Sequence, residues 1–223
     1  MQLPPEYQPP AATMYAHRTL PERLRTEGWA FNLNAMNLPI QARWFAADCA
    51  LWGFCEEQGA RPPSLFFDWQ FTAARDAIVA LYNFRDAIAG CQGNLRKIKE
   101  WKALTDTVAL ERASEEFKCE FPGIRQLRTT VVHAVELFDN EEQMTKNSAK
   151  PGKHWGAEVS ANQKNVVISG NFTGPTYSAM HGGVTYEVDL TTDKIHALNK
   201  ITADILGAFS RLPNYAQPGW PRR

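Results

Sequence analysis

The 223-residue sequence carries no net charge, few cysteines and no long apolar run, and each of these absences excludes a class of protein. Its 24 basic residues are balanced by 24 acidic ones, which argues against a protein that coats nucleic acid or an anionic membrane through its overall field. No stretch approaches the roughly 18 apolar residues that suggest a membrane span. We therefore expect no membrane partner, although the balance allows local charged patches.

The sequence also gives little sign of a metal, a cofactor or an oxidising environment. Its four cysteines are scattered without a C-x-x-C pair: Cys49, Cys55, Cys91 and Cys119. The first 20 residues lack the continuous apolar run of a signal peptide, so we expect reduced thiols and a cytoplasmic location. His154, His181 and His196 lack the spacing of metal ligands, and we expect neither a metal nor a cofactor.

Changes in composition divide the chain into four parts. Residues 1–21 contain five prolines, which predicts an extended arm on the surface or on a partner. Residues 22–140 are predicted to form a helical bundle. Residues 153–212 are predicted to form a small antiparallel sheet and a C-terminal helix packed on the bundle, and residues 213–223 a tail.

Apolar residues at spacings of three and four predict four helices in the bundle, at residues 39–58, 64–90, 104–118 and 124–138. The first is expected to begin at Pro39, because proline is favoured in the first turn of a helix. The polar stretch GCQGNLRKIKEWK is expected to connect the second helix to the third.

Val, Ile, Thr and aromatic residues predict three short antiparallel strands at residues 155–160, 165–172 and 184–190. Thr191 or Thr192 is expected to cap a last helix. The predicted fold class is therefore α+β and mainly α: a four-helix bundle, a small three-stranded antiparallel sheet and a C-terminal helix.

Two segments outside the predicted helices are minor candidates for a site. The first is a basic cluster around Trp101 that could meet an RNA backbone, with one aromatic ring for stacking; its members are Arg96, Lys97, Lys99 and Lys102. The second is the segment TGPTYSAMHGG, expected to be an inter-strand loop, in which Tyr177, Ser178 and His181 could line a small-molecule pocket. The alternatives are a solvated connector and a plain surface loop.

The main functional signal lies in the predicted helix at 124–138. At about 100° per residue, His133 projects roughly 150° from the centre of the apolar stripe, on the same face as Arg125 and Glu136. His133 is therefore expected either in solvent or in a second contact surface. Val132 beside it suggests that something covers this face.

Arg128, four intervening residues and His133, late in a helical bundle, resemble the Arg-x4–6-His motif of the HEPN superfamily, many of whose members are ribonucleases. The resemblance implies a metal-independent homodimer that cleaves or binds RNA in defence or stress response. Its two motifs would face each other across a dimer groove. His133 would then act as general acid or base, and Arg128 would hold the phosphate. Thr129 departs from the common motif, in which Asn, Asp or His follows the arginine.

The alternative is a non-catalytic dimerisation or protein-interaction module. Here the face with Val132 and His133 would mediate dimerisation, and the sheet or the Pro-rich arm would bind a protein partner. Five residues of helix separate Arg128 from His133 by about 140°, so the two side chains would converge only through the reach of arginine or across a dimer. The acidic stretch at 136–142 would also repel phosphate.

Overall fold

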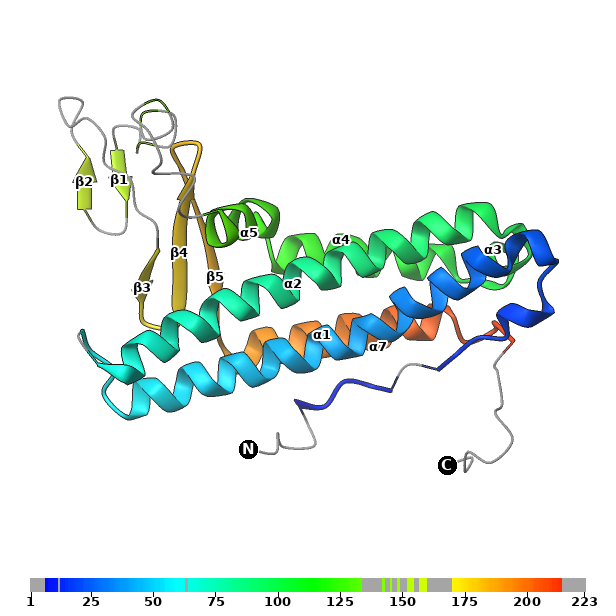
Figure 1. The fold of residues 1–223 in the computed structure, drawn as a ribbon, viewed down its shortest axis with the longest axis horizontal. Coiled ribbons are helices and arrows are strands. Elements are labelled where there is room, and N and C mark those ends of the chain that lie inside the picture. The colour runs from blue at the N-terminus through cyan, green and yellow to red at the C-terminus, as the bar shows by residue number, and fades with distance from the viewer. Residues whose placement is uncertain are drawn as a thin grey trace. The chain divides into compact units, whose positions relative to one another are not determined.

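The computed structural model describes residues 7–11, 13–62, 64–133, 142, 145, 148, 152–154, 157–159 and 170–213. The helical elements are η2 (His17–Thr19), η3 (Glu22–Leu24), α1 (Arg25–Glu57), α2 (Leu65–Lys97), α3 (Lys99–Leu104), α4 (Thr107–Glu120), α5 (Ile124–Val132) and α7 (Thr192–Ala208). The strands are β1 (Gly152–His154), β2 (Ala157–Val159), β3 (Asn171–Thr173), β4 (Thr176–His181) and β5 (Val184–Asp189). Long helices precede a three-stranded antiparallel sheet and a C-terminal helix (Figure 1), which confirms the predicted mainly helical α+β class.

The described helices include none with the length and apolarity that crossing a membrane requires.

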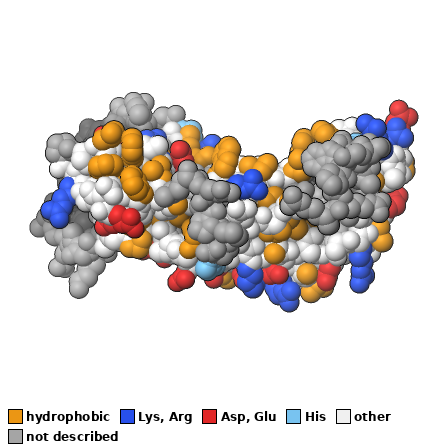
Figure 2. All heavy atoms as spheres, turned by 90° about the horizontal axis from the view of Figure 1, so that it is seen from below, with side chains coloured by type: hydrophobic (Ala, Val, Ile, Leu, Met, Phe, Trp, Pro, Cys, Tyr) orange, Lys and Arg blue, Asp and Glu red, His pale blue; other side chains and the backbone are white. Residues whose placement is uncertain are grey.

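The face seen in Figure 2 carries basic and acidic side chains interspersed among the coloured, described residues. Charge of one sign is therefore not gathered over this face, in keeping with the balanced composition.

The predicted start of the first helix is wrong, because α1 begins at Arg25 and Pro39 lies inside it. An interior proline removes one backbone hydrogen bond and costs about 3 kcal/mol. On both sides of Pro39, however, a continuous stripe of side chains is buried, formed by Phe31, Ala35, Leu38 and Ala42. Burial of this stripe outweighs the local penalty, since tertiary packing supplies most of the stability of a helix in a protein.

The predicted connector at residues 90–102 is also wrong, because α2 continues to Lys97 and α3 follows at once. Phe84, Ile88, Cys91 and Leu95 are all buried and continue one helical stripe. The polar residues that suggested a connector occupy the other faces of the same helix. Ile98 leaves helical geometry, with φ −102° and ψ 84°, and separates α2 from α3.

The segment predicted to be an inter-strand loop is β4, the central strand of the order β3-β4-β5. Two hairpins flank it. Thr173 pairs with Thr176 and His181 with Val184, so each connection has two residues. Gly174 and the Gly182-Gly183 pair adopt positive φ there, as tight hairpin loops require. The glycines thus mark the two ends of a strand.

The remaining strand predictions are met in part. The predicted strand at 184–190 corresponds to β5, and the predicted strand at 155–160 overlaps β2, which pairs with β1 in a separate two-stranded sheet. Of the predicted strand at 165–172, only the last two residues belong to β3. Its first five residues lie outside the described residues.

The chain forms two compact units, each taken here by itself. The first comprises residues 1–43, 83–119 and 195–223, as far as they are described. In its core, Tyr15 and Phe31 pack against each other and against both Trp101 and Phe209, with ring centroids 4.9 to 6.4 Å apart. Lys200 of α7 also pairs with Glu116 of α4 at 2.8 Å.

The second unit comprises residues 44–82 and 120–194, again as far as they are described. Its core includes a triangle formed by Phe71 of α2, Phe172 of β3 and Tyr177 of β4, with centroids 4.9 to 6.3 Å apart. The helix α5 packs on β4 and β5. This unit therefore contains both residues of the predicted site.

Candidate functional site

The helix α5 is held against the sheet by its start and by its buried face. Gly123 precedes the helix in the left-handed region, with φ 69°, and a Cβ at this position would collide with the ring of Tyr186. The hydroxyl of Thr130 donates to the carbonyl of Gln126 at 3.1 Å and to that of Met180 at 3.4 Å. The sheet therefore fixes the position from which Arg128 and His133 project.

Arg128 lies half-buried against an aromatic ring of α2. Its guanidinium carbon is 5.1 Å from the centroid of the Tyr82 ring, within the range of a cation–π contact. Tyr82 therefore restricts the guanidinium to one place on the surface of the unit. A fixed guanidinium presents its planar set of donors to a phosphate with little loss of conformational freedom.

His133 is the residue at which α5 ends. Its backbone N–H donates to the carbonyl of Thr129 at 3.0 Å, but its own φ of −108° and ψ of 26° leave helical geometry. The helix thus ends at Val132, and residues 134–138 of the predicted helix lie outside the described residues. The helix is nevertheless continuous from Arg128 to Val132, so the two side chains leave α5 on different sides, and the predicted need for arginine reach or a dimer to bring them together remains. The His133 side chain is half-buried.

Arg75 of α2 is a member of this site that the sequence analysis missed. Its Nη2 donates to the carbonyl of Val131 at 3.1 Å, in the last turn of α5, where a cation interacts favourably with the helix dipole. Arg75 precedes Tyr82 by seven residues, so both lie on one face of α2. This spacing was visible in the sequence, but nothing local indicated that α5 would pack there.

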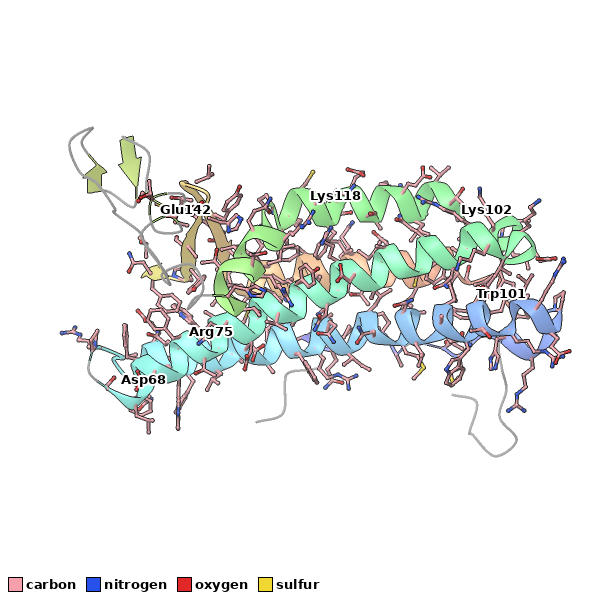
Figure 3. The ribbon with its side chains drawn as sticks, turned by 45° about the horizontal axis from the view of Figure 1, so that its top comes forward. Asp68, Arg75, Trp101, Lys102, Lys118 and Glu142 are labelled. Atoms are coloured by element: carbon pink, nitrogen blue, oxygen red, sulfur yellow. The ribbon has the colours of Figure 1, made fainter. Side chains whose placement is uncertain are left out.

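We call Arg75, Tyr82, Arg128 and His133 the α5-end cluster. Figure 3 shows Arg75 projecting from α2, the helix that also carries Tyr82. The charge of Arg75 also acts on Tyr177 of β4, which is not part of the cluster. Burial raises the pKa of Tyr177 to about 12, and the positive charge of Arg75 opposes that rise. The residues of this cluster carry two guanidinium groups and one imidazole, the side chains that bind phosphate and transfer protons near neutral pH, and its shown contacts are those of Arg128 with Tyr82 and of Arg75 with Val131.

The aromatic part of the predicted basic cluster is wrong. Trp101 is only 2% exposed and packs edge-on against Phe31, with centroids 5.3 Å apart; Figure 3 marks it beside Lys102 on α3. Because the segment is helical, Trp101 lies on the apolar side and cannot stack on a base. Lys97 pairs with Glu27 at 3.8 Å, the arrangement of a solvated helix surface.

The predicted pocket in the inter-strand segment is wrong as well. Tyr177 and Ser178 are both buried in the central strand, and because successive residues of a strand point to opposite faces, both faces of β4 are covered at this place. The Ser178 hydroxyl donates to the Glu187 carboxylate at 3.2 Å across the β4–β5 pair. His181 ends the strand, and its Nδ1 is buried without a hydrogen-bond partner among the described residues.

The other titratable groups among the described residues are not arranged as a metal site. Within the described ranges, no three His, Cys, Asp or Glu side chains are grouped to hold an ion. Burial raises the pKa of Asp48 on α1 to about 7, and the negative charge of Asp76 on α2 adds to the rise. Burial also raises the pKa of three thiols, those of Cys49, Cys55 and Cys91, whereas Cys119 is exposed.

No protein-family model, curated protein or solved structure matches this chain. The functional argument therefore depends on the α5-end cluster and on the motif that Arg128 and His133 form.

Proposed function

We propose that this chain is a HEPN-like protein that binds and cleaves RNA as a homodimer in defence or stress response. The observation that carries the proposal is the placement of Arg128, which Tyr82 holds at 5.1 Å on the helix that His133 ends. A guanidinium held on a helix whose last position carries an imidazole supplies the two groups that cleavage of a phosphodiester uses.

The proposed reaction is attack of an RNA 2′-hydroxyl on the adjacent phosphate. His133 accepts the proton of the hydroxyl while its oxygen bonds to phosphorus. The bond from phosphorus to the 5′-oxygen breaks, and the histidine of the second protomer supplies the proton that the leaving oxygen needs. Arg128 stabilises the charge that develops on the phosphate oxygens. The products are a 2′,3′-cyclic phosphate and a 5′-hydroxyl end.

Arg75 acts as a positioning residue in this scheme. Its hydrogen bond to the carbonyl of Val131 fixes the last turn of α5, the turn that determines where His133 projects. Its charge also favours the approach of a polyanion to a protein whose net charge is zero. Contact with RNA is thus local, and the affinity for nucleic acid in general is expected to be low.

The test is cleavage of end-labelled RNA by the wild-type protein and by Arg128→Ala and His133→Ala. We expect cleavage by the wild type and a loss of about 100-fold or more in each variant. The matched control is Arg125→Ala, which removes an exposed arginine from the same helix and should leave the rate unchanged. Equal rates in all four proteins, or no cleavage by any of them, would contradict the proposal.

One observation favours the alternative of a non-catalytic dimerisation module. Val132, next to His133, is 46% exposed, and an apolar side chain at this place suits a protein interface. Under this alternative, Val132→Asp combined with His133→Glu yields folded monomers in sedimentation, and the wild type forms dimers without cleaving RNA. An oligomeric state that is the same in both proteins rules the alternative out.

A further inference from the structure

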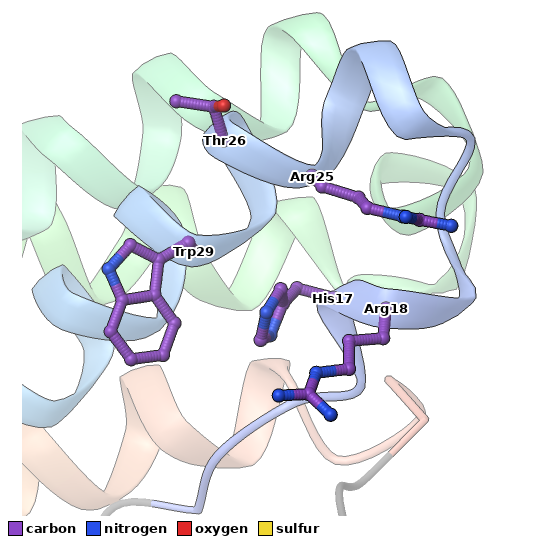
Figure 4. A pocket seen from close by; sticks show the side chains of 5 residues that line it. All are labelled: His17, Arg18, Arg25, Thr26 and Trp29. Carbon is purple, nitrogen blue, oxygen red and sulfur yellow. The ribbon is translucent and has the colours of Figure 1, made fainter.

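The first unit contains a hollow that is separate from the α5-end cluster. It has a volume of about 510 Å³ and is lined by five described residues: His17, Arg18, Arg25, Thr26 and Trp29. This volume lies within the range of small-molecule sites. Figure 4 shows His17 between Trp29 on one side and the two arginines on the other. Two segments, η2 and the start of α1, thus bring an imidazole, an indole and two guanidinium groups together.

The sequence makes room for this arrangement at Gly28. A Cβ at Gly28 would lie 2.9 Å from the Cβ of His17 and 2.6 Å from the Cδ1 of Leu20. Leu20 is buried, and it ends η2. Because Gly28 has no side chain, the backbone of η2 can lie directly on α1, which places His17 beside Trp29.

The position and tautomer of His17 are set by Asn32. Asn32 is fully buried; its Oδ1 accepts from the N–H of Tyr15 and its Nδ2 donates to the Tyr15 carbonyl, both at 2.9 Å. This pair of bonds fixes which end of the amide is the donor. Nδ2 also lies 3.3 Å from the Nδ1 of His17, so Nδ1 accepts a hydrogen bond. The proton of the neutral ring is then on Nε2, which is left to donate to a ligand.

The arginines give the hollow its preference for an anion. Arg25 donates through Nε to the carbonyl of Leu20 at 3.3 Å, which anchors the guanidinium by one nitrogen. Among the described residues, no carboxylate forms an ion pair with the Nη1 or Nη2 of Arg25. None of the five lining residues is acidic. Glu27, in the same turn of α1, is directed to Lys97 at 3.8 Å. Guanidinium groups bind phosphate through paired hydrogen bonds.

Trp29 adds a surface for a planar group. Its side chain is 43% exposed, and its ring centroid lies 5.3 Å from that of His17 at an interplanar angle of 59°. Contact with His17 holds the indole while one part stays open to solvent. Exposed aromatic faces beside cations stack on nucleobases without regard to sequence.

We propose that this hollow binds a nucleoside 5′-phosphate, either as a free nucleotide or as the phosphorylated 5′ end of an RNA. Arg18, Arg25 and the Nε2 of His17 bind the phosphate, and Trp29 stacks on the base. The site lies wholly in the first unit. It therefore does not depend on the proposed reaction at His133, and either proposal can fail without the other.

The first measurement compares ligands by calorimetry on the full-length protein. We expect 5′-AMP to bind at least tenfold more tightly than adenosine and than inorganic phosphate, because only 5′-AMP engages both the arginines and Trp29. Short 2′-O-methyl RNA with and without a 5′-phosphate distinguishes the two sources and cannot be cleaved through the 2′-oxygen. If the 5′-phosphorylated RNA binds more tightly than both the unphosphorylated RNA and 5′-AMP, the ligand is an RNA end. If it binds no more tightly than 5′-AMP, the ligand is a free nucleotide. Equal affinities for 5′-AMP and adenosine, or no binding of either, would overturn the proposal.

The second measurement uses variants of single lining residues. Arg25→Gln and Arg18→Gln should each weaken 5′-AMP binding about tenfold or more. Trp29→Leu should weaken 5′-AMP binding while leaving the affinity for inorganic phosphate unchanged. The matched control is Arg23→Gln, an exposed arginine of η3 outside the lining.

Thermal unfolding of each variant tests whether it folds. If Arg25→Gln does not, because it has lost its bond to Leu20, Arg18→Gln and Trp29→Leu decide the matter. If Arg23→Gln weakens 5′-AMP binding as much as the lining variants do, the binding depends only on overall positive charge, and the proposal is overturned.

Discussion

Asp48→Asn is expected to stabilise the protein, and the gain should grow with pH. Burial and the nearby charge of Asp76 raise the pKa of Asp48 from 3.8 to about 7. Each pKa unit corresponds to about 1.4 kcal/mol, so ionising this carboxyl in the folded protein costs up to about 4 kcal/mol. Because the folded pKa lies above the unfolded one, the cost is absent below about pH 4, increases between pH 4 and pH 7, and is complete above pH 7.

Urea denaturation at several pH values from 4 to 8.5 measures this effect. An asparagine does not ionise, so the unfolding free energy of Asp48→Asn should exceed that of the wild type by a margin that rises across the window and approaches 4 kcal/mol at pH 8. Asp76→Asn is the matched comparison. This substitution removes the charge of Asp76, the smaller cause of the raised pKa of Asp48, and leaves Asp48 buried. The pH dependence of the unfolding free energy should therefore decrease only in part. A difference between Asp48→Asn and wild type that stays constant from pH 4 to 8.5 would refute the reasoning.

Two further predictions concern stability. Gly123→Ala should lower the unfolding free energy by about 2 kcal/mol or more, because φ is 69° and the new Cβ collides with Tyr186; Gly207→Ala, in α7 with open space around it, should raise it by about 0.5 to 1 kcal/mol. Thermal denaturation compares the two, and a Gly123→Ala protein as stable as wild type would contradict the close contact. Asn32→Ala should cost about 2 kcal/mol, since it leaves the buried N–H of Tyr15 unpaired and removes one of the two hydrogen bonds to the Tyr15 carbonyl, which still accepts from the N–H of His17. The exposed Asn171→Ala should change stability by less than about 0.5 kcal/mol, and equal effects of the two substitutions would show that the buried bonds do not matter.

The elements that the sequence predicted well are those whose stability is encoded locally. The C-terminal helix is one: α7 begins at Thr192, and the N–H of Lys194 lies 3.4 Å from the hydroxyl of Thr191, the expected cap. Its apolar stripe is buried as the spacing indicated, including Ile195 and Leu198. The start of α5 at Ile124 was predicted for the same reason.

The errors in the predicted secondary structure arise where contacts between distant parts of the chain determine the local structure. Pro39 looked like a helix start because local preference was the only information, whereas packing on both sides keeps it inside α1. In the same way, the glycines around β4 marked hairpins that only the pairing with β3 and β5 makes visible.

Within the candidate site, Arg128 and His133 were found from their spacing alone. The bond from Arg75 to Val131, which joins residues 56 positions apart, could not be found in this way. The position of Tyr82 under Arg128 has the same origin, since it depends on how α2 and α5 pack.

The four cysteines allow local unfolding of the protein to be measured by the rate at which their thiols are modified. Cys119 is exposed, while Cys91 in the first unit and Cys49 and Cys55 in the second are buried. A thiol reagent added to the native protein should therefore modify Cys119 at once and the others only when their surroundings open. Because the buried thiols are divided between the units, the rates at which their peptides gain mass give the opening free energy of each unit separately, with no label introduced by mutation.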